Sequence, residues 1–245
     1  MLPVDLSENP ADPKANIISA SGRGATSGPA AKKKSSSSSK ARTGTSFDGE
    51  LILASTSPYR RELLERLGIP FRAEASGVDE SLVKADGLMP ERTVMQLALE
   101  KAGAVSKKRK GAIVIASDQA PEFDGELLDK PGTVERAVAQ LQRLSGKTHR
   151  LLTALVVHDG RTGKTVQHMD VHTMAMRKLT RAQIEAYVER DQPLDCSGSY
   201  KWESLGVALF ESVRGDDSTA IIGLPLIRLV AILQEMGVDV LGPGA

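Results

Sequence analysis

Cysteine and long apolar runs are nearly absent from this sequence of 245 residues. The single cysteine, Cys196, excludes an internal disulfide and a cysteine metal cluster, and it fits a reducing compartment. The best candidate for a membrane span, IIGLPLIRLVAIL, is short and contains Arg228. The N-terminus lacks the apolar core of a signal peptide. We therefore expect a cytoplasmic protein with no membrane contact.

Aromatic side chains and net charge are also scarce. Aromatic residues make up 3% of the chain against 40% hydrophobic residues, so the core should be mainly aliphatic. Through Asp48 the chain has seven Lys/Arg against four Asp/Glu, so this part carries +3 and the remainder −2. Proteins that bind a nucleic-acid polymer need a basic excess, which the remainder lacks. The expected partner is a small molecule.

Residues 1–47 differ in composition from everything that follows them. This stretch is rich in Ser, Ala, Gly and Lys and has almost nothing to bury, so we expect a disordered, low-complexity tail. A weak partner contact through Lys32, Lys33 and Lys34 is the alternative to a purely solubilising role. The sequence thus predicts a tail at 1–47 and a folded domain over 48–245.

Helical and strand-like patterns alternate from Glu50 onward, which is typical of an α/β protein. A hairpin is expected around Asp124-Gly125, because this dipeptide favours a tight turn. The expected strands are 51–54, 71–75, 112–116, 150–158, 165–176 and 207–212. The expected helices are 58–67, 90–108, 134–144, 180–190 and 224–236.

The stretch LILASTSPYRRELLERL places hydroxyls and two arginines where a strand passes into a helix. Ser57 is a suitable N-cap and Pro58 suits the first helical position. Helix N-termini favour bound anions, and Arg60 and Arg61 add positive charge, so one interpretation is a phosphate site. The alternative is an ordinary capped helix with solvated arginines, and this stretch alone does not choose between them.

Three polar clusters each follow an expected strand: the opening stretch, VDE ending at Glu80, and IVIASDQ with Asp118. Ligand groups collect beyond the carboxyl ends of strands in an open α/β sheet, so we expect these clusters to share one cleft. An acidic residue at the end of a buried strand is costly unless it is paired, which favours a functional role for Asp118. For Glu80 the case for a functional role is weaker than for Asp118, because carboxylates on the surface are common. Lys101 and Lys130 have no functional signal of their own.

Together these residues combine an anion site with carboxylates suited to Mg²⁺ or Mn²⁺, which predicts phosphoryl chemistry. Neither GxxxxGK[ST] nor GxGxxG occurs, so P-loop and Rossmann sites are excluded. The four histidines make no case for a Ser-His-Asp triad.

Seven motifs in order resemble the Maf-like nucleotide pyrophosphatases: LASTSPYRRELLERLGI, VDES, LALEKA, IASDQ, DKPGTVERAVAQLQRLSGKTHRLLTAL, CSGSYKWESLG and IIGLPL. The resemblance covers the chain from Leu51 to the last helix. It implies an elongated mixed α/β sheet with flanking helices and a nucleotide cleft between two lobes. It also implies hydrolysis of nucleoside triphosphates to monophosphate and pyrophosphate with a divalent metal cation, Mg²⁺ or Mn²⁺, and commonly a homodimer.

Matching of motifs carries functional residues over from that family. By this resemblance Ser57, Arg60 and Glu80 belong to the phosphate and metal site. Lys101 and Lys130 fall at phosphate-binding lysines, and Asp118 falls at the proposed proton acceptor. Whether Asp118 acts as base, as metal ligand or as both stays open.

The subfamily follows from three positions: Tyr59, Gln119 and Glu203 resemble the 7-methyl-GTP pyrophosphatases rather than the members acting on dTTP and UTP. A 7-methylguanine ring is positively charged, so it should stack on Tyr59 with cation–π character. Glu203 can accept hydrogen bonds from guanine N–H groups, which uracil does not match. The alternative is that Tyr59 only packs between helix and sheet and that Glu203 pairs with Lys201.

Two residues depart from the family pattern. Pro121 removes an amide after Gln119 and is expected to distort the hairpin that leads to Lys130. Trp202 is larger than the usual residue. The rivals to the predicted activity are the same chemistry on dTTP or UTP, and a nucleotide-binding cell-division regulator with little turnover.

Overall fold

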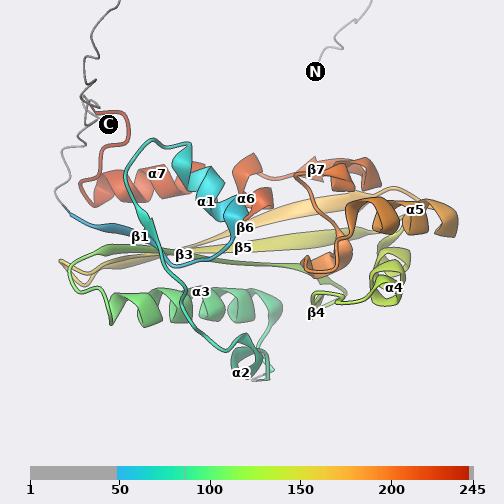
Figure 1. Ribbon diagram of the computed structural model, residues 1–245, viewed down its shortest axis with the longest axis horizontal. Coiled ribbons are helices and arrows are strands. Elements are labelled where there is room, and N and C mark those ends of the chain that lie inside the picture. The colour runs from blue at the N-terminus through green and yellow to red at the C-terminus, as the bar shows by residue number, and fades with distance from the viewer. Residues whose placement is uncertain (1–48, 86, 243–245) are drawn as a thin grey trace, which may run out of the picture. The chain divides into compact units, whose positions relative to one another are not determined.

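The computed structural model describes residues 49–85 and 87–242, so the tail expected at 1–47 lies outside the described residues. The strands form one sheet in the order β2-β1-β3-β5-β6-β7, with β4 paired to β3 (Figure 1). The strands are β1 (Leu51–Leu53), β2 (Arg72–Ala73), β3 (Ile113–Phe123), β4 (Glu126–Leu127), β5 (Thr148–Asp159), β6 (Thr165–Met176) and β7 (Phe210–Arg214).

The sheet is mixed, because β1 runs parallel to β2 and β3 while the β3–β5, β5–β6 and β6–β7 pairs are antiparallel. Long helices flank it, which confirms the predicted α/β class. The helices are α1 (Pro58–Glu65), α2 (Glu80–Ala85), α3 (Pro90–Ser106), α4 (Val134–Leu144), α5 (Arg181–Asp191), α6 (Ser218–Ile222) and α7 (Leu226–Glu235), with 3₁₀ turns at Ser197–Ser199 and Leu205–Leu209.

Each face of the sheet is covered by different helices (Figure 1). On one face α1 and α7 pack leucines and isoleucines against β1, β3 and β5. On the other face α3 packs against the same strands through alanines and valines. A third cluster joins α4 and α5 to the distal ends of β5 and β6. These clusters are mainly aliphatic, as the composition predicts. Among the described residues no helix has the length and hydrophobicity that a membrane crossing requires.

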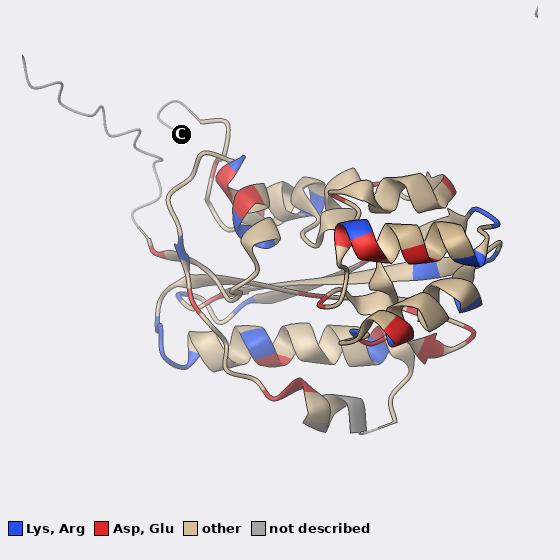
Figure 2. Ribbon diagram, turned by 45° about the vertical axis from the view of Figure 1, so that its right-hand side comes forward, with Lys and Arg blue, Asp and Glu red and all other residues tan. Residues whose placement is uncertain are grey.

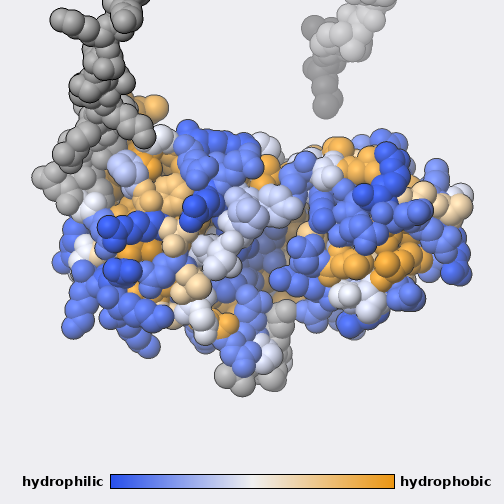
Figure 3. Space-filling view, in the orientation of Figure 1, coloured by the Kyte–Doolittle hydropathy of each residue, from blue (hydrophilic) through white to orange (hydrophobic). Residues whose placement is uncertain are grey.

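Charged side chains of both signs are spread over the helices in the view of Figure 2, and the surface in Figure 3 is largely hydrophilic with separate hydrophobic patches. This mixed surface fits the near-neutral composition of the folded part.

Local sequence signals placed several boundaries correctly. Ser57 caps α1 by accepting a hydrogen bond from the Arg60 amide, and Thr133 caps α4 in the same way. Thr180 forms a capping box at the start of α5. The expected hairpin is present between β3 and β4, with positive φ at Asp124 and Gly125 as a type I′ turn requires.

The largest correction concerns β3, which was expected to end at Ala116 but continues to Phe123. Pro121 does not distort it. The Ile115 carbonyl accepts from Ala54, the residue directly after β1. Residue 121 lies six positions further along β3, so its backbone faces the same side of the strand as that of Ile115. The N–H that Pro121 lacks would therefore face the side on which β1 has already ended. The Pro121 carbonyl accepts from Leu128, and the residue pairs with Leu151 of β5.

Other differences are smaller. The strand expected over 207–212 begins with a 3₁₀ turn, and β7 starts only at Phe210. The strand expected over 71–75 shrinks to the two residues of β2. Two short helices, α2 and α6, were not expected, and both lie at the site described next.

Candidate active site

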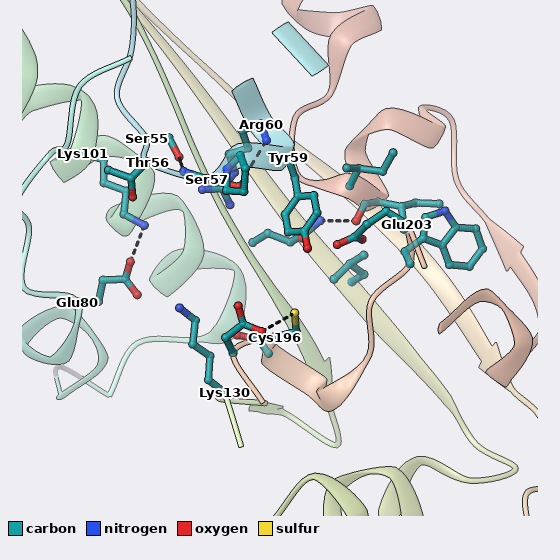
Figure 4. A pocket seen from close by; sticks show the side chains of 18 of the residues that line it. Ser55, Thr56, Ser57, Tyr59, Arg60, Glu80, Lys101, Lys130, Cys196 and Glu203 are labelled. Carbon is teal, nitrogen blue, oxygen red and sulfur yellow. Dashed lines mark hydrogen bonds and ion pairs between the residues drawn. The ribbon is translucent and has the colours of Figure 1, made fainter. Parts of the chain in front are cut away.

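A cavity of about 590 Å³ opens where β1, β3, α1 and the loop before β7 meet. A charged end holds Arg60, Glu80, Lys101 and Asp118, and an aromatic end holds Tyr59, Tyr200, Trp202 and Glu203. Glu80 and Lys101 lie together on one side of Figure 4, Tyr59 and Glu203 lie on the other, and Ser57 lies between them. Eight of the nine predicted site residues line the cavity: Ser57, Tyr59, Arg60, Glu80, Lys101, Gln119, Lys130 and Glu203. The ninth, Asp118, contacts the lining residue Lys101.

An ion-pair network organises the charged end. Lys101, on α3, is buried, and its Nζ lies 2.7 Å from Glu80 Oε1 and 2.5 Å from Asp118 Oδ1. Glu80 comes from the first turn of α2 and Asp118 from β3, so three consecutive elements, α2, α3 and β3, converge on one ammonium group. The network brings both expected metal ligands to one point.

Asp118 does not follow the end of a strand, as the sequence analysis expected, but lies inside β3 opposite Ala154. Its neighbourhood is nevertheless open on one side, because β1 stops at Leu53, opposite Ile115. Strand alternation then directs Asp118 to the α3 face, where Lys101 lies, and Ser117 to the opposite face. The early end of β1 therefore produces the cleft.

The opening arginines separate in space. Arg60 lines the cavity, and its Nε donates to the Gly223 carbonyl at 3.0 Å. Ser117 Oγ donates to the same carbonyl at 2.8 Å. Burial lowers the pKa of the Arg60 guanidinium, and the negative charges of Asp118 and Glu80 oppose this shift. Arg61 is exposed and lines a separate hollow beside β2, so only one of the two arginines reaches the site.

Hydroxyls and a second lysine complete the charged end. The Ser55 side chain is buried and accepts from the Ser57 amide at 3.1 Å, which holds the turn before α1. Ser57 Oγ serves as the N-cap of α1 and also lines the cavity. Lys130 is exposed at the cavity wall. The N-terminus of α1 therefore faces the cavity together with Arg60, an arrangement that favours an anion.

At the aromatic end Tyr59 and Glu203 are neighbours. Burial, followed by the charge and hydrogen bonding of Glu203, raises the pKa of Tyr59 to about 12. The sequence analysis considered an ion pair between Lys201 and Glu203. In the structure Lys201 Nζ instead donates to the Asp191 carbonyl at 3.0 Å. Trp202 packs on Phe210 with ring centroids 5.8 Å apart.

Gln119 is fixed by the short helix α6. Its Nε2 donates to the Ala220 carbonyl at 2.7 Å, to the Ile221 carbonyl at 3.1 Å and to Thr153 Oγ1 at 2.9 Å. These contacts use the amide nitrogen, so a role of Gln119 in specificity has to act through its oxygen.

Sequence reasoning missed the residues that support the site. The Gly223 carbonyl accepts from both Arg60 and Ser117. The φ of +123° at Gly223 would strain any other residue, and an added Cβ would lie 3.2 Å from Arg60 Nε. The IIGLPL motif contained this glycine, but its long-range partners gave no local signal. Cys196 also lines the cavity, where burial raises its pKa to about 12, so a thiolate nucleophile is not favoured.

The donor set fits a hard divalent cation. Within residues 49–85 and 87–242 no group of three or more His, Cys, Asp or Glu side chains is arranged for a metal. Glu80 and Asp118 nevertheless converge on one positive group. Mg²⁺ is typically held by one or two carboxylates together with substrate phosphates and water, so two converging carboxylates are sufficient.

The fold and the cavity define an α/β protein in which one cavity joins cationic side chains to aromatic ones. The chain belongs to the Maf-like protein family, whose model matches residues 50–236. It is 46% identical over 193 residues to the 7-methyl-GTP pyrophosphatase of Albidiferax ferrireducens, covering 79% of this chain and 96% of that protein.

Other relatives carry the same name. The 7-methyl-GTP pyrophosphatase of Bdellovibrio bacteriovorus is 47% identical over 186 residues, covering 76% of this chain and 96% of that protein. That of Thiobacillus denitrificans is 48% identical over 192 residues, covering 78% of this chain and 94% of that protein.

Proposed function

We propose that this chain is a nucleotide pyrophosphatase that hydrolyses 7-methyl-GTP to the monophosphate and pyrophosphate in the cytoplasm. The observation that carries the proposal is that one cavity joins a charged end to an aromatic end that bears a carboxylate. The names of the relatives support the same substrate. The resemblance also implies a homodimer, which the mass from light scattering of the purified full chain would test.

The charged end would hold the triphosphate. Arg60, Lys101, Lys130 and the N-terminus of α1 capped by Ser57 would neutralise its phosphoryl oxygens, which is the main task in phosphoryl transfer. Asp118 would take a proton from the attacking water. An oxygen–phosphorus bond forms at the α-phosphorus, the bond from that phosphorus to the α–β bridging oxygen breaks, and pyrophosphate leaves.

Glu80 and Asp118 would hold Mg²⁺ or Mn²⁺, which supplies positive charge at the phosphates when it is bound. The same carboxylate of Asp118 can accept a proton through one oxygen while its other oxygen serves the cation, so the two roles are compatible.

The aromatic end would select the base. Tyr59 offers a flat face for a cationic ring, and Glu203 beside it offers acceptor oxygens for guanine N–H groups. Gln119 would present its carbonyl oxygen as a further acceptor, because its nitrogen is held by α6. The acceptor oxygens at this end favour guanine, whose edge offers neighbouring N–H donors. Uracil and thymine present mainly carbonyl acceptors at the matching edge and are disfavoured.

A pyrophosphate-release screen over 7-methyl-GTP, GTP, dTTP and UTP with Mg²⁺ and Mn²⁺ tests the proposal. The expected result is the highest kcat/KM for 7-methyl-GTP. A preference for dTTP or UTP would overturn the assigned base pocket, and tight nucleotide binding without turnover would favour the regulator instead.

A further inference from the structure

Lys101 lies between the two carboxylates that we propose as ligands of the divalent cation. Its side chain is as buried as that of Asp118, each about 10% exposed, and its Nζ contacts both Glu80 and Asp118. A buried ammonium group is stable only with such counter-charges. The lysine and the two carboxylates therefore form one unit rather than three independent ligands.

A metal ion cannot simply join this unit. A divalent cation bonded to carboxylate oxygens lies about 2.0–2.1 Å from each of them for Mg²⁺. Because Lys101 Nζ already lies 2.5 Å and 2.7 Å from one oxygen of each carboxylate, the two positive groups would be within a few ångströms of each other. Like charges this close repel each other, most strongly beside Asp118, where both Lys101 and the carboxylate are buried.

We propose that Lys101 couples the binding of the cation to the binding of the nucleotide. Without a nucleotide, the ammonium group competes with the cation for Glu80 and Asp118. A bound triphosphate gives the ammonium group a new partner and leaves the carboxylates to the cation. The inference rests on the proposed function, and linkage requires that the cation strengthen nucleotide binding by the same factor.

Manganese binding measures this competition directly. Electron paramagnetic resonance of free Mn²⁺ gives the Kd of the full-length wild type and of Lys101→Met, which removes the charge but keeps the length. Lys130→Met is the matched control, because Lys130 lines the same cavity but is exposed. Lys101→Arg keeps the positive charge and serves as the second control.

Without nucleotide, Lys101→Met should bind Mn²⁺ about tenfold more tightly than the wild type, within the range typical of coupled sites. Lys130→Met and Lys101→Arg should stay near the wild-type Kd. The α,β-methylene analogue of 7-methyl-GTP should tighten Mn²⁺ binding to the wild type and to Lys130→Met. It should tighten binding to Lys101→Met severalfold less.

Glu80→Gln in the wild-type background separates failure of the inference from failure of the site. If this change weakens Mn²⁺ binding but Lys101→Met leaves it equal or weaker, the cation site stands and the coupling is wrong. If Glu80→Gln has no effect on Mn²⁺ binding, the cation site is wrong and the coupling falls with it.

Folding is monitored in the same series. Lys101→Met leaves two carboxylates without their ammonium partner and is expected to lower Tm. Mn²⁺ should then raise the Tm of Lys101→Met more than that of the wild type. An equal or smaller rise would contradict the competition independently of the titrations.

Discussion

At the charged end of the cavity, the two helices α2 and α3 and the strand β3 meet through direct ion pairs, with Lys101 between Glu80 and Asp118. At the aromatic end, the side chains come mostly from one loop before β7, with Tyr59 added from α1. A change at the charged end alters the partners of several other residues, whereas Glu203 can change while the sheet and helices stay as they are. The comparison suggests that the chemistry is fixed by the fold and the base specificity by a loop.

The strongest test of this division is Asp118→Asn. The change should lower kcat by roughly 10²–10⁴-fold, the usual contribution of a general base, because the amide cannot take up the proton. Because the aromatic end is untouched, KM for 7-methyl-GTP should change only severalfold. Steady-state kinetics with thermal unfolding as the folding control gives both values. Near-normal turnover in a folded variant would remove Asp118 from the mechanism.

The elements that were predicted well are those with a local physical cause. The Ser57 cap and the Asp124-Gly125 turn act within four residues, so the sequence carries their whole signal. Such features fixed the fold class and the neighbourhood of the site.

The elements that were missed depend on distant partners. β3 extends to Phe123 because β5 pairs with it residue by residue, and the sequence near Ala116 contains no local signal for this pairing. Arg60 reaches the cavity and Arg61 does not, since the Gly223 carbonyl far along the chain holds only Arg60. The residues of the site were nominated by motif, but their contacts followed from tertiary structure.

A second test concerns the pH dependence of stability that a buried histidine next to the aromatic end should cause. His149 is buried beside Tyr200, with Nε2 3.0 Å from the hydroxyl, and burial lowers the pKa of His149 to about 4. Between pH 6.5 and 4 the unfolded chain binds a proton that the folded chain does not bind, so stability falls as the pH falls. The full loss is about 3 kcal/mol, from about 1.4 kcal/mol per pKa unit.

Urea unfolding of the wild type and of His149→Gln at pH 7, 5.5 and 4 measures this effect. The variant should show a weaker decline across this range, and His158→Gln, at a less buried position, should decline like the wild type. Trp202 is the sole tryptophan and packs on Phe210 in the same cluster, so its emission reports this end. Equal pH dependence in all three proteins would show that His149 does not carry the effect.

A third test changes base recognition without touching the charged end. Glu203→Gln keeps the size but replaces an acceptor oxygen with a donor. A hydrogen bond to a charged group is worth about 1.5–3 kcal/mol, so kcat/KM for both guanine nucleotides should fall by roughly 10–100-fold.

The matched control is Glu211→Gln, an exposed carboxylate of β7, which should have no effect. The measurement is kcat/KM for 7-methyl-GTP, GTP and UTP in both variants. An equal loss for UTP would place Glu203 in the charged machinery and would break the division between the two ends.

The smallest expected effect separates charge recognition from shape recognition at the aromatic end. Tyr59→Leu keeps an apolar side chain but removes the ring. Both guanine nucleotides then lose ordinary stacking, and 7-methyl-GTP alone also loses the cation–π attraction. That part is worth about 0.5–2 kcal/mol, so KM for 7-methyl-GTP should rise roughly 2–30-fold. GTP carries no fixed charge on its base and should be affected less, while Tyr59→Phe should keep the preference because the ring remains. The ratio of kcat/KM for the two substrates is the readout, since it cancels any general loosening of α1. A ratio unchanged in Tyr59→Leu would mean that Tyr59 only packs between helix and sheet, and that recognition of the methylated base lies elsewhere in the loop.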